Sequence, residues 1–555
     1  MYEQVLDPVG GSLLLSALVA MLPLLTLFVL LGGLKLRAHV AGLAALGVAI
    51  FVAVVAYGMP FGTSLAAATE GAAFGLFPIM WIVWNAIWIY NLTVDTGHFA
   101  VLRRSFATIS DDQRIQAVII AFCFGALLEA LAGFGTPVAI TAVMLIAVGF
   151  KPMKAAAVAL VANTAPVAFG AIATPIVTLA ELTEIPKEDL GAMVGRQTPL
   201  LAVFVPLILV GMVDGKRGVR AVWPAALVGG VTFAVGQFVS SNFISVELTD
   251  IIGALLATGA MVLFLRVWQP ADPLLVDAPG GRPAIAGAAA HDASHEADVR
   301  RREGNGPDSR GDILKAYAPY VIIIAVFALA QWSVIKDALA NGATSFTWPG
   351  TGDIRTAAGE APGATTFSFV WLGAAGTLLL FSGLLTMILL RITPARALRA
   401  YGAMLNQLKW ATLTVAAVLA LAYVMNLSAQ TLTIGTWIAG AGGLLAFLSP
   451  IIGWLGVAVT GSDTSSNSLF GVLQVTAAKE AGLDQTLLAA SNSSGGVLGK
   501  MISPQNLAIG AAAVGLGGEE GELLRRVLGW SLVLLLVMCV LVYLQSTAVL
   551  SWMVV

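Results

Sequence analysis

Charged residues are scarce in this chain of 555 residues. Asp, Glu, Lys and Arg make up 11% of it, against roughly a quarter in an average soluble domain. Hydrophobic residues make up 58%, and the mean hydropathy is +0.90. A soluble core has no room for so much apolar surface, so the composition predicts a membrane protein. The net charge of −2 gives no sign of nucleic-acid binding.

Metal-ligating residues are also scarce. The two cysteines, Cys123 and Cys539, stand in apolar runs, and the four histidines are scattered along the chain. This pattern fits neither a disulfide framework nor a zinc site, and we expect both cysteines to be small packing residues. We therefore predict no metal site and no cofactor. An enzyme is not predicted either, because the sequence shows no metal site and no nucleophile with its base.

Long apolar runs, by contrast, are abundant. A helix that spans a bilayer needs about 20 mainly apolar residues. Two further regions, 115–180 and 433–515, are apolar but repeatedly interrupted by Gly, Pro, Ser, Thr and Asn. We predict an all-α polytopic membrane protein with about 12–16 membrane segments, some of them broken helices or re-entrant hairpins. The clear candidate spans are residues 12–34, 38–60, 76–94, 197–214, 222–243, 250–268, 314–336, 366–391, 408–427 and 527–552.

The hydrophilic segment 269–312 divides the chain. It is rich in Pro, Gly and charged residues, so we expect a flexible linker there. Lys and Arg concentrate in several of the loops between spans, and the positive-inside rule assigns these loops to the cytoplasm. With that assignment the clear spans alternate in direction, and both termini lie outside the cytoplasm.

Two pairs of motifs suggest an internal repeat. NTAPVAFGAIATP at 163–175 and NSSGGVLGKMISP at 492–504 share Asn, Gly and Pro at matching positions, and GFGT at 133–136 pairs with GSDT at 461–464. The flanking spans pair in the same order, with opposite directions by the charge rule. We therefore predict inverted-topology repeats, which are typical of secondary transporters. Chance agreement between two Gly- and Pro-rich segments is the alternative. The predicted parts are a first repeat at 1–220, connecting helices at 221–268, the linker at 269–312 and a second repeat at 313–555.

Polar runs interrupt the apolar regions at 133–137, 163–166, 461–467 and 491–496, and we predict a helix break at each. Unpaired backbone groups are costly in hydrocarbon, so such breaks are tolerated only where protein or a watery cavity covers them. A half-helix that starts after a break exposes N–H groups at its positive end, which suits a carboxylate or a phosphate.

Three ionisable residues, Glu129, Asp463 and Lys500, lie within these interrupted regions. Ionisable groups inside a membrane segment are costly and are therefore candidates for function. Structural roles are the alternatives. Lys500 would then pair with one of the two acids, Glu129 would brace the break that follows it, and hydroxyl groups would satisfy Asp463.

These motifs resemble the bacterial lactate permease family, of the L-lactate and glycolate permease type. The resemblance covers essentially the whole chain. The motifs that show it include EALAGFGTPVAI (129–140), GSDTSSNSLFG (461–471) and SNSSGGVLGKMISPQNLAIGAAAVG (491–515). It implies a multi-pass protein of the bacterial inner membrane. It also implies proton symport of short 2-hydroxymonocarboxylates into the cell: L-lactate, with D-lactate and glycolate as further substrates. Residues 491–493 also resemble the Ser-Asn-Thr-like substrate motif of a larger ion-transporter group, with Ser493 where that motif has Thr.

The residues and the resemblance together suggest a division of roles. Lys500 would supply a fixed positive charge, and half-helix starts near Asn163 and Asn492 would hold the substrate carboxylate. Asp463 or Glu129 would carry the coupling proton, because burial raises the pKa of a carboxylic acid. Helix capping is the alternative for the Ser, Thr and Asn residues. The predicted substrate-binding residues are Asn163, Thr164, Ser491, Asn492, Ser493 and Lys500.

Other transport mechanisms stay open from the sequence. In a sodium-coupled carboxylate carrier, Asp463 and nearby Ser, Thr and Asn groups would ligate sodium. An ion channel would also use broken helices. The expected partners are a lactate or glycolate anion, protons and the lipid bilayer, without nucleic acid.

Overall fold

The computed structural model describes residues 1–34, 36–107, 109–133, 135–274, 309–330, 332–356, 359–516 and 518–555. Most of the predicted linker, at 275–308, lies outside this part of the chain. The described residues are mainly helical, which confirms the all-α prediction. The strands are short: β1 (Tyr2–Glu3), β2 (Ala343–Thr347), β3 (Ile354–Arg355) and β4 (Thr366–Val370).

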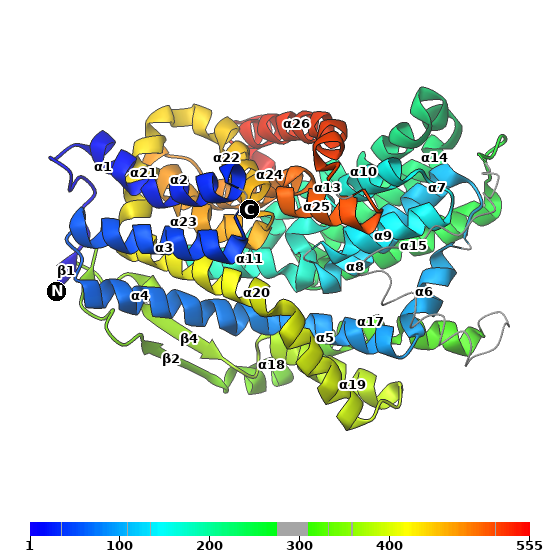
Figure 1. Ribbon diagram of the computed structural model, residues 1–555, viewed down its shortest axis with the longest axis horizontal. Helices are drawn as coiled ribbons and strands as arrows, with labels where there is room; N and C mark the ends of the chain where they lie inside the picture. The colour runs from blue at the N-terminus through cyan, green and yellow to red at the C-terminus, as the bar shows by residue number, and fades with distance from the viewer. Residues whose placement is uncertain are drawn as a thin grey trace.

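Helices of the first half and the connecting region follow one another with short turns (Figure 1). They are α1 (Leu13–Ala20), α2 (Leu22–Phe28), α3 (Ala38–Val55), α4 (Phe61–Phe74), α5 (Trp81–Asp95), α6 (His98–Ala107), α7 (Gln113–Gln116), α8 (Gly125–Ala132), α9 (Thr136–Ala147), α10 (Pro152–Ala162), α11 (Gly170–Thr183), α12 (Lys187–Val194), α13 (Thr198–Ala202), α14 (Val205–Phe243) and α15 (Thr249–Val267). A π-helical segment, Ala117–Phe124, joins α7 to α8.

The second half begins after the linker. Its helices are α17 (Arg310–Ala330), α18 (Ser333–Ala340), α19 (Ala375–Leu389), α20 (Pro394–Leu427), α21 (Gln430–Ile438), α22 (Leu445–Thr460), α23 (Asp463–Ala481), α24 (Gln485–Gly499), α25 (Pro504–Ala513) and α26 (Glu520–Gln545).

The helices fit a membrane protein. Among the described residues, 10 helical segments are long and apolar enough to cross a bilayer, or 11 with the bent pair of α10 and α11. The shorter apolar helices α9 and α19 bring the number of membrane segments into the predicted range. The chain is therefore a multi-pass membrane protein.

Burial separates a central helix from the outer ones. The most apolar stretch of Gln113–Leu131 is entirely buried, whereas two thirds of that of Leu13–Gly33 is not. Large apolar side chains on the outer helices are exposed, for example Phe51 and Val55 on α3 and Leu536 on α26. A soluble protein rarely exposes so many of them, and in a bilayer these faces contact lipid.

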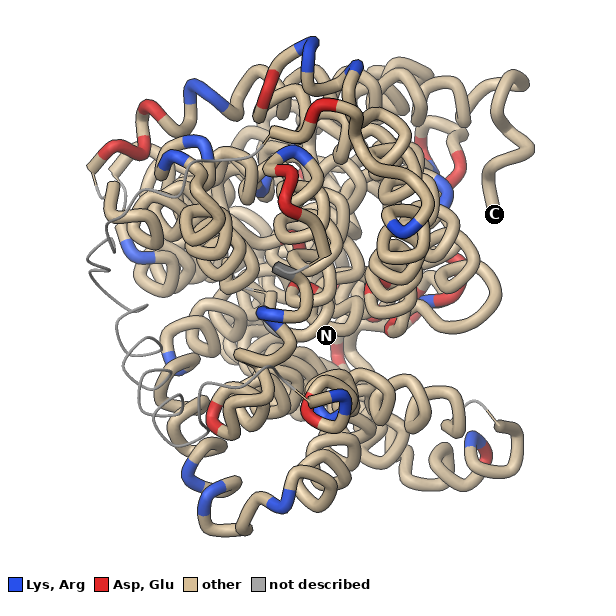
Figure 2. The backbone as a smooth tube through the Cα atoms, turned by 90° about the vertical axis from the view of Figure 1, so that its right-hand side faces the viewer, with Lys and Arg blue, Asp and Glu red and all other residues tan. Residues whose placement is uncertain are grey.

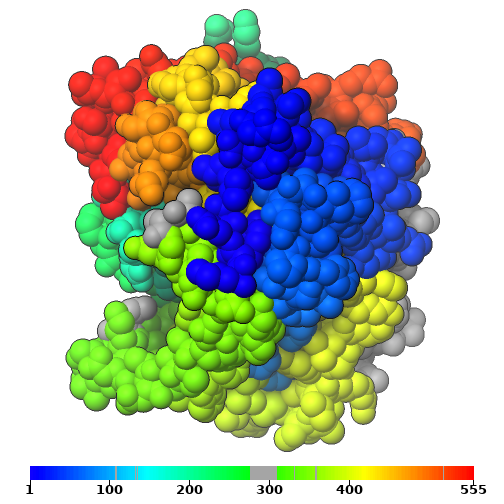
Figure 3. All heavy atoms as spheres, turned by 90° about the vertical axis from the view of Figure 1, so that its left-hand side faces the viewer, coloured from blue at the N-terminus to red at the C-terminus, as the bar shows by residue number. Residues whose placement is uncertain are grey.

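The two halves pack against each other. Helix α20 lies along α3 and α4, and α11 packs on α23 (Figure 1). At the N-terminus β1 pairs in parallel with β3, so the first residues lie against the segment before α19 (Figure 3). Among the described residues, the order helix, break, helix occurs twice in each half, but the internal repeat itself stays a prediction. The domain boundaries and the inverted orientation stay predictions.

One end of the molecule, at the right of Figure 1, carries charged residues of both signs (Figure 2). There the buried Arg114 donates from Nη2 to Asp112 Oδ2 at 2.6 Å and from Nη1 to Asp214 Oδ2 at 3.2 Å. Burial alone would raise the pKa of Asp112. The hydrogen bonds from Arg114 and from the Leu274 amide outweigh burial and lower that pKa below its ordinary value.

The predicted break at 133–137 is present, at the junction of α8 and α9. Gly135 precedes α9 with φ +84°, a conformation that favours glycine, and a Cβ there would lie 2.5 Å from Ile509 Cδ1. The predicted break at 163–166 is also present, and the axes of α10 and α11 differ by 66° across it. Both breaks lie inside the protein, where packing covers their backbone.

The second half departs from the prediction. A break is present at Gly461 and Ser462, but α23 already begins at Asp463. The predicted break at 491–496 is wrong, because this run lies inside α24, and the helix is interrupted only after Gly499. The small residues serve helix packing instead: a Cβ on Gly495 would collide with the Pro450 carbonyl of α22. Small residues allow close approach of membrane helices.

Candidate functional site

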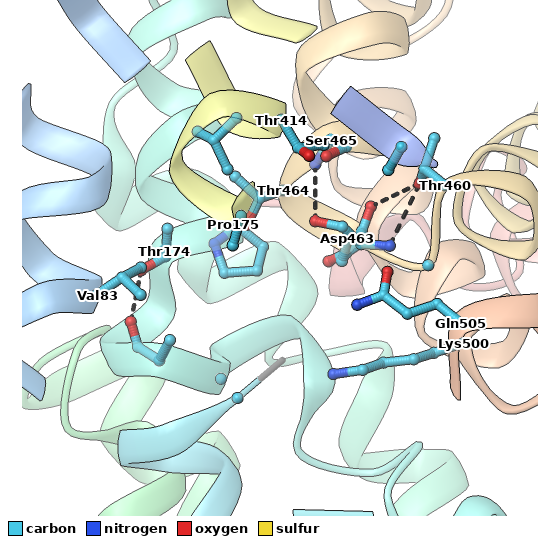
Figure 4. A pocket seen from close by; sticks show the side chains of 18 of the residues that line it. Val83, Thr174, Pro175, Thr414, Thr460, Asp463, Thr464, Ser465, Lys500 and Gln505 are labelled. Carbon is cyan, nitrogen blue, oxygen red and sulfur yellow. Dashed lines mark hydrogen bonds between the residues drawn. The ribbon is translucent and has the colours of Figure 1, made fainter. Parts of the chain in front are cut away.

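A cavity of about 710 Å³ lies among the breaks (Figure 4). Its wall includes all three predicted ionisable residues, Glu129, Asp463 and Lys500. It extends from these buried groups to the exposed side chains of Leu36 and Arg37. Other lining residues come from the starts of α3, α11, α23 and α25, from α20 and from the end of α22 with the break after it: His39, Gly170, Ala171, Thr174, Pro175, Trp410, Thr414, Thr460, Ser462, Thr464, Ser465 and Gln505.

Lys500 and Glu129 form a buried ion pair across the two halves. Lys500 Nζ lies 2.5 Å from Glu129 Oε1, and the two residues are 7% and 2% exposed. Asn163 Nδ2 donates to the other carboxylate oxygen at 2.9 Å. A pair this deeply buried needs both partners, because removing one leaves an uncompensated charge. Of the two acids with which Lys500 was expected to pair, Glu129 and Asp463, the structure shows pairing with Glu129.

Asp463 stands at the start of α23, one residue after its N-cap, Ser462. The helix dipole favours a negative charge at this end. Ser493 Oγ donates to Asp463 Oδ2 at 2.5 Å. The other oxygen, Oδ1, is buried and has no hydrogen-bond partner among the described residues. The carboxyl group is therefore held on one side and unsatisfied on the other.

The polar residues of α24 form a layer behind the cavity wall. Asn492 Nδ2 donates to Asn467 Oδ1 at 2.9 Å, and Asn467 Nδ2 donates to the Pro175 carbonyl at 3.0 Å. Ser491 Oγ donates to the Leu488 carbonyl at 2.8 Å. This network connects α24, through α23, to the interrupted helix α11 of the first half.

Asn163 and Thr164 lie at the C-terminal end of α10. Asn163 is the C-cap residue, and Thr164 Oγ1 donates to the Val161 carbonyl at 2.7 Å. The expectation of a half-helix start near Asn492 is wrong, since Asn492 is inside α24, whereas a helix does start soon after Asn163, with α11 from Gly170. Helix starts that reach the cavity wall are those of α3, α11, α23 and α25.

The structure thus separates the predicted residues into two groups. The three charged residues line the cavity. The neutral ones, Asn163, Thr164, Ser491, Asn492 and Ser493, are absent from its wall in the described part of the chain. They bond to backbone, to a lining residue or, for Asn492, to Asn467 of the layer behind the wall. Their direct contact with a substrate stays a prediction.

Some lining residues were not predicted. Thr174 and Pro175 belong to the first repeat motif, so a signal for them existed in the sequence. Next to them Ala171 begins three consecutive non-glycine residues with positive φ, an unfavourable backbone that turns this segment along the cavity. His39 and Trp410, whose rings stack with centroids 4.5 Å apart, come together only through the packing of α3 on α20.

A charged cavity among interrupted helices, inside a bundle of membrane spans, is the arrangement of a membrane transport protein. The chain belongs to the L-lactate permease family, whose family model matches residues 16–549. This confirms the resemblance found in the sequence. The family and the relatives below are described as permeases, which confirms the prediction of a transporter and not an enzyme.

Relatives match over the full length of the chain. The chain is 41% identical to the L-lactate permease of Bacillus subtilis, covering 100% of both proteins. It is 41% identical to glycolate permease GlcA of Escherichia coli over 98% of each, and 39% identical to the L-lactate permease of the same organism over 100% of each.

Similarity to solved structures is weaker. The Neisseria gonorrhoeae MtrF structure aligns with a TM-score of 0.44 and 16% identity, over 86% of this chain and 82% of that one. The Alcanivorax borkumensis YdaH transporter aligns with a TM-score of 0.42 and 14% identity, over 86% of each chain. At these values the two structures carry no argument about function.

Proposed function

We propose that this protein imports L-lactate by proton symport across the bacterial inner membrane, and that D-lactate and glycolate are further substrates. Full-length relatives at about 40% identity described as L-lactate and glycolate permeases support the substrate class. The buried Lys500–Glu129 pair in the wall of the cavity carries the proposal for the mechanism.

The proposed substrate site uses the positive groups of the cavity. The substrate carboxylate binds Lys500, assisted by the N-terminal ends of α23 and α25, where the helix dipole favours an anion. The lining side chains Thr174, Ser465 and Gln505 provide neutral donors and acceptors for the 2-hydroxyl group. The neutral residues behind the wall then act by positioning: Asn163 and Thr164 at the first-half break, and Ser491, Asn492 and Ser493 on α24.

The coupling proton is carried by Glu129 in this proposal. While Glu129 is ionised it neutralises Lys500, and the lysine is not available to a substrate carboxylate. A proton on Glu129 ends this pairing, so proton binding and anion binding occur together. One anion with one proton moves no net charge, which avoids about 2.3 kcal/mol per charge for each 100 mV of opposing membrane potential.

Asp463 has a separate role in the proposal. Its unpaired Oδ1 accepts a hydrogen bond from the substrate hydroxyl, while Ser493 and the start of α23 stabilise its charge. The same free oxygen also favours a second candidate, sodium-coupled carboxylate transport. There Asp463 would ligate sodium with neighbouring hydroxyl and carbonyl oxygens.

Uptake of labelled L-lactate into proteoliposomes tests the proposed function. An inward proton gradient is imposed in sodium-free buffer, and excess D-lactate or glycolate is added as a competitor. We expect labelled L-lactate to accumulate, and accumulation to stop when a protonophore removes the gradient. Both competitors should reduce the accumulation. Accumulation that requires a sodium gradient at constant pH would favour the second candidate. Absence of uptake under both gradients would refute the substrate class.

A further inference from the structure

A further buried carboxyl group, that of Asp250, lies outside the cavity wall, on the connecting helices. Asp250 stands in the first turn of α15, and its partner Gln237 is on α14, which packs along α15. Both residues are 0% exposed. Neither residue is among those that line the cavity.

Gln237 joins Asp250 to the first-half break. Its Nε2 donates to Asp250 Oδ1 at 3.0 Å and to the Ala165 carbonyl at 3.0 Å. Ala165 follows Asn163 and Thr164 in the turn that separates α10 from α11. Asn163 in turn holds Glu129. A continuous path of contacts thus runs from Asp250 to the carboxylate that pairs with Lys500.

Two acceptors of this pair are left without a donor. Asp250 Oδ2 and Gln237 Oε1 are both buried and have no hydrogen-bond partner among the described residues. An ionised Asp250 explains neither, because a carboxylate and an amide oxygen only accept. A proton on Oδ2 would make this oxygen a donor that Gln237 Oε1 could accept from. The acid and the amide would then bond reciprocally, N–H to Oδ1 and O–H to Oε1.

The surrounding charges also argue for a neutral acid. The charged groups that act on Asp250 from the neighbouring elements are Glu129 and Lys500. These two are paired with each other at 2.5 Å, so Asp250 has no counter-ion of its own. An isolated buried carboxylate pays a large desolvation penalty, which a single neutral hydrogen bond does not offset.

We propose that Asp250 is a second proton-binding site, which keeps its proton throughout the transport cycle and, as a reciprocal pair with Gln237, positions the Asn163–Ala165 break around Glu129. The net charge near Asp250 stays constant on the proposed cycle. Lys500 is balanced by Glu129 when the site is empty and by the substrate carboxylate when Glu129 is protonated. Asp250 is thus a positioning residue, and its proton is not transported.

Two substitutions that each replace a carboxyl by an amide separate this role from that of Glu129. In Asp250→Asn the amide N–H reproduces the acid O–H toward Gln237. We expect proton-driven lactate uptake within about twofold of wild type and an unchanged pH profile, since both hydrogen bonds are kept. The matched variant Glu129→Gln should lose accumulation. In Asp250→Leu both bonds are lost, and we expect uptake to fall at least about tenfold. Loss of accumulation in Asp250→Asn would overturn the proposal, because it would show that this carboxyl must ionise.

Infrared spectroscopy of the purified wild-type protein tests the protonation without any transport. The carbonyl stretch of a protonated carboxylic acid should be present near neutral pH, disappear in Asp250→Asn, and stay unshifted when L-lactate is added. If wild-type protein and Asp250→Asn showed the same carboxylic-acid bands, the proposal would be overturned. The transport arm rests on the proposed function, whereas the spectrum does not. A wild-type protein without proton-driven uptake but with the Asp250 band would refute only the proposed function.

Discussion

Lys500 Nζ and Glu129 Oε1 are 2.5 Å apart, although the two residues are separated by 371 positions in the sequence. One residue comes from the interrupted end of α24 and the other from α8, so the pair joins the two halves of the chain at the cavity. A membrane protein retains such a pair at a cost in desolvation. We therefore expect the pair to serve transport more than stability.

Replacing one residue of the Lys500–Glu129 pair should destabilise the protein more than replacing both. Lys500→Gln leaves Glu129 buried and unpaired, a loss of about 3–5 kcal/mol for a buried ion pair. The double variant Glu129→Gln/Lys500→Gln should recover most of that stability. Melting temperatures in detergent measure the stability of the wild type, the single variant and the double variant. Lactate uptake should be absent in both variants, because both lack the lysine that binds the substrate carboxylate. Equal melting temperatures of the single and double variants would contradict the pairing.

The hydrogen bond from Ser493 to Asp463 should matter for substrate affinity. Ser493→Ala removes a bond to a charged group, worth about 1.5–3 kcal/mol, so we expect KM for lactate to rise about tenfold or more. Ser382→Ala is the control, because Ser382 is equally buried but bonds only to the Leu378 carbonyl of its own helix among the described residues. An unchanged KM in Ser493→Ala would remove Asp463 from the substrate site.

Two glycines leave room for the acidic side chains of the cavity. A Cβ on Gly496 would collide with Asp463 Oδ1, and a Cβ on Gly170 would lie 2.9 Å from Glu129 Oε1. We expect Gly496→Ala and Gly170→Ala to reduce uptake at least about tenfold while leaving the protein folded, since overpacking typically costs about 1–3 kcal/mol. Gly402→Ala on α20, where a Cβ meets nothing within 4 Å, should transport normally. Normal uptake in both site variants would contradict the cavity geometry.

Acid should weaken the charged network at α7. The pKa of Asp112 is lowered in the folded protein, so its stabilising effect is fully present above the unfolded value of about 3.9 and is lost as the pH falls through the folded pKa. We expect Asp112→Asn to melt lower than wild type at neutral pH, and the difference to shrink below about pH 4. Asp111→Asn, at the exposed neighbouring position, is the control. A difference that grows as the pH falls would show the opposite sign and refute the assignment.

Much of the fold and the charged part of the site were predictable from the sequence. Apolar runs of spanning length identify membrane helices, and an ionisable residue inside such a run is conspicuous, as Glu129, Asp463 and Lys500 are. The pairing of Lys500 with Glu129, and not with Asp463, depends on how α8 and α24 pack. No local pattern contains that information.

The errors have physical causes. Small polar residues both interrupt membrane helices and allow two helices to approach closely, so the run at 491–496 was read as a break although it is a packing surface. Asp250 is the first residue of the predicted span 250–268, and no role was predicted for it. Its burial follows from the packing of α14 on α15, which the sequence of either helix does not reveal.

The most direct test of the account compares accumulation with exchange in Glu129→Gln. Proteoliposomes are loaded with unlabelled L-lactate, and entry of labelled L-lactate is measured without any gradient; a second set is empty and receives an inward proton gradient. Because the amide leaves Lys500 free without a proton, we predict exchange close to the wild-type rate and no proton-driven accumulation. Accumulation at the wild-type level in this variant would contradict the claim that Glu129 carries the coupling proton.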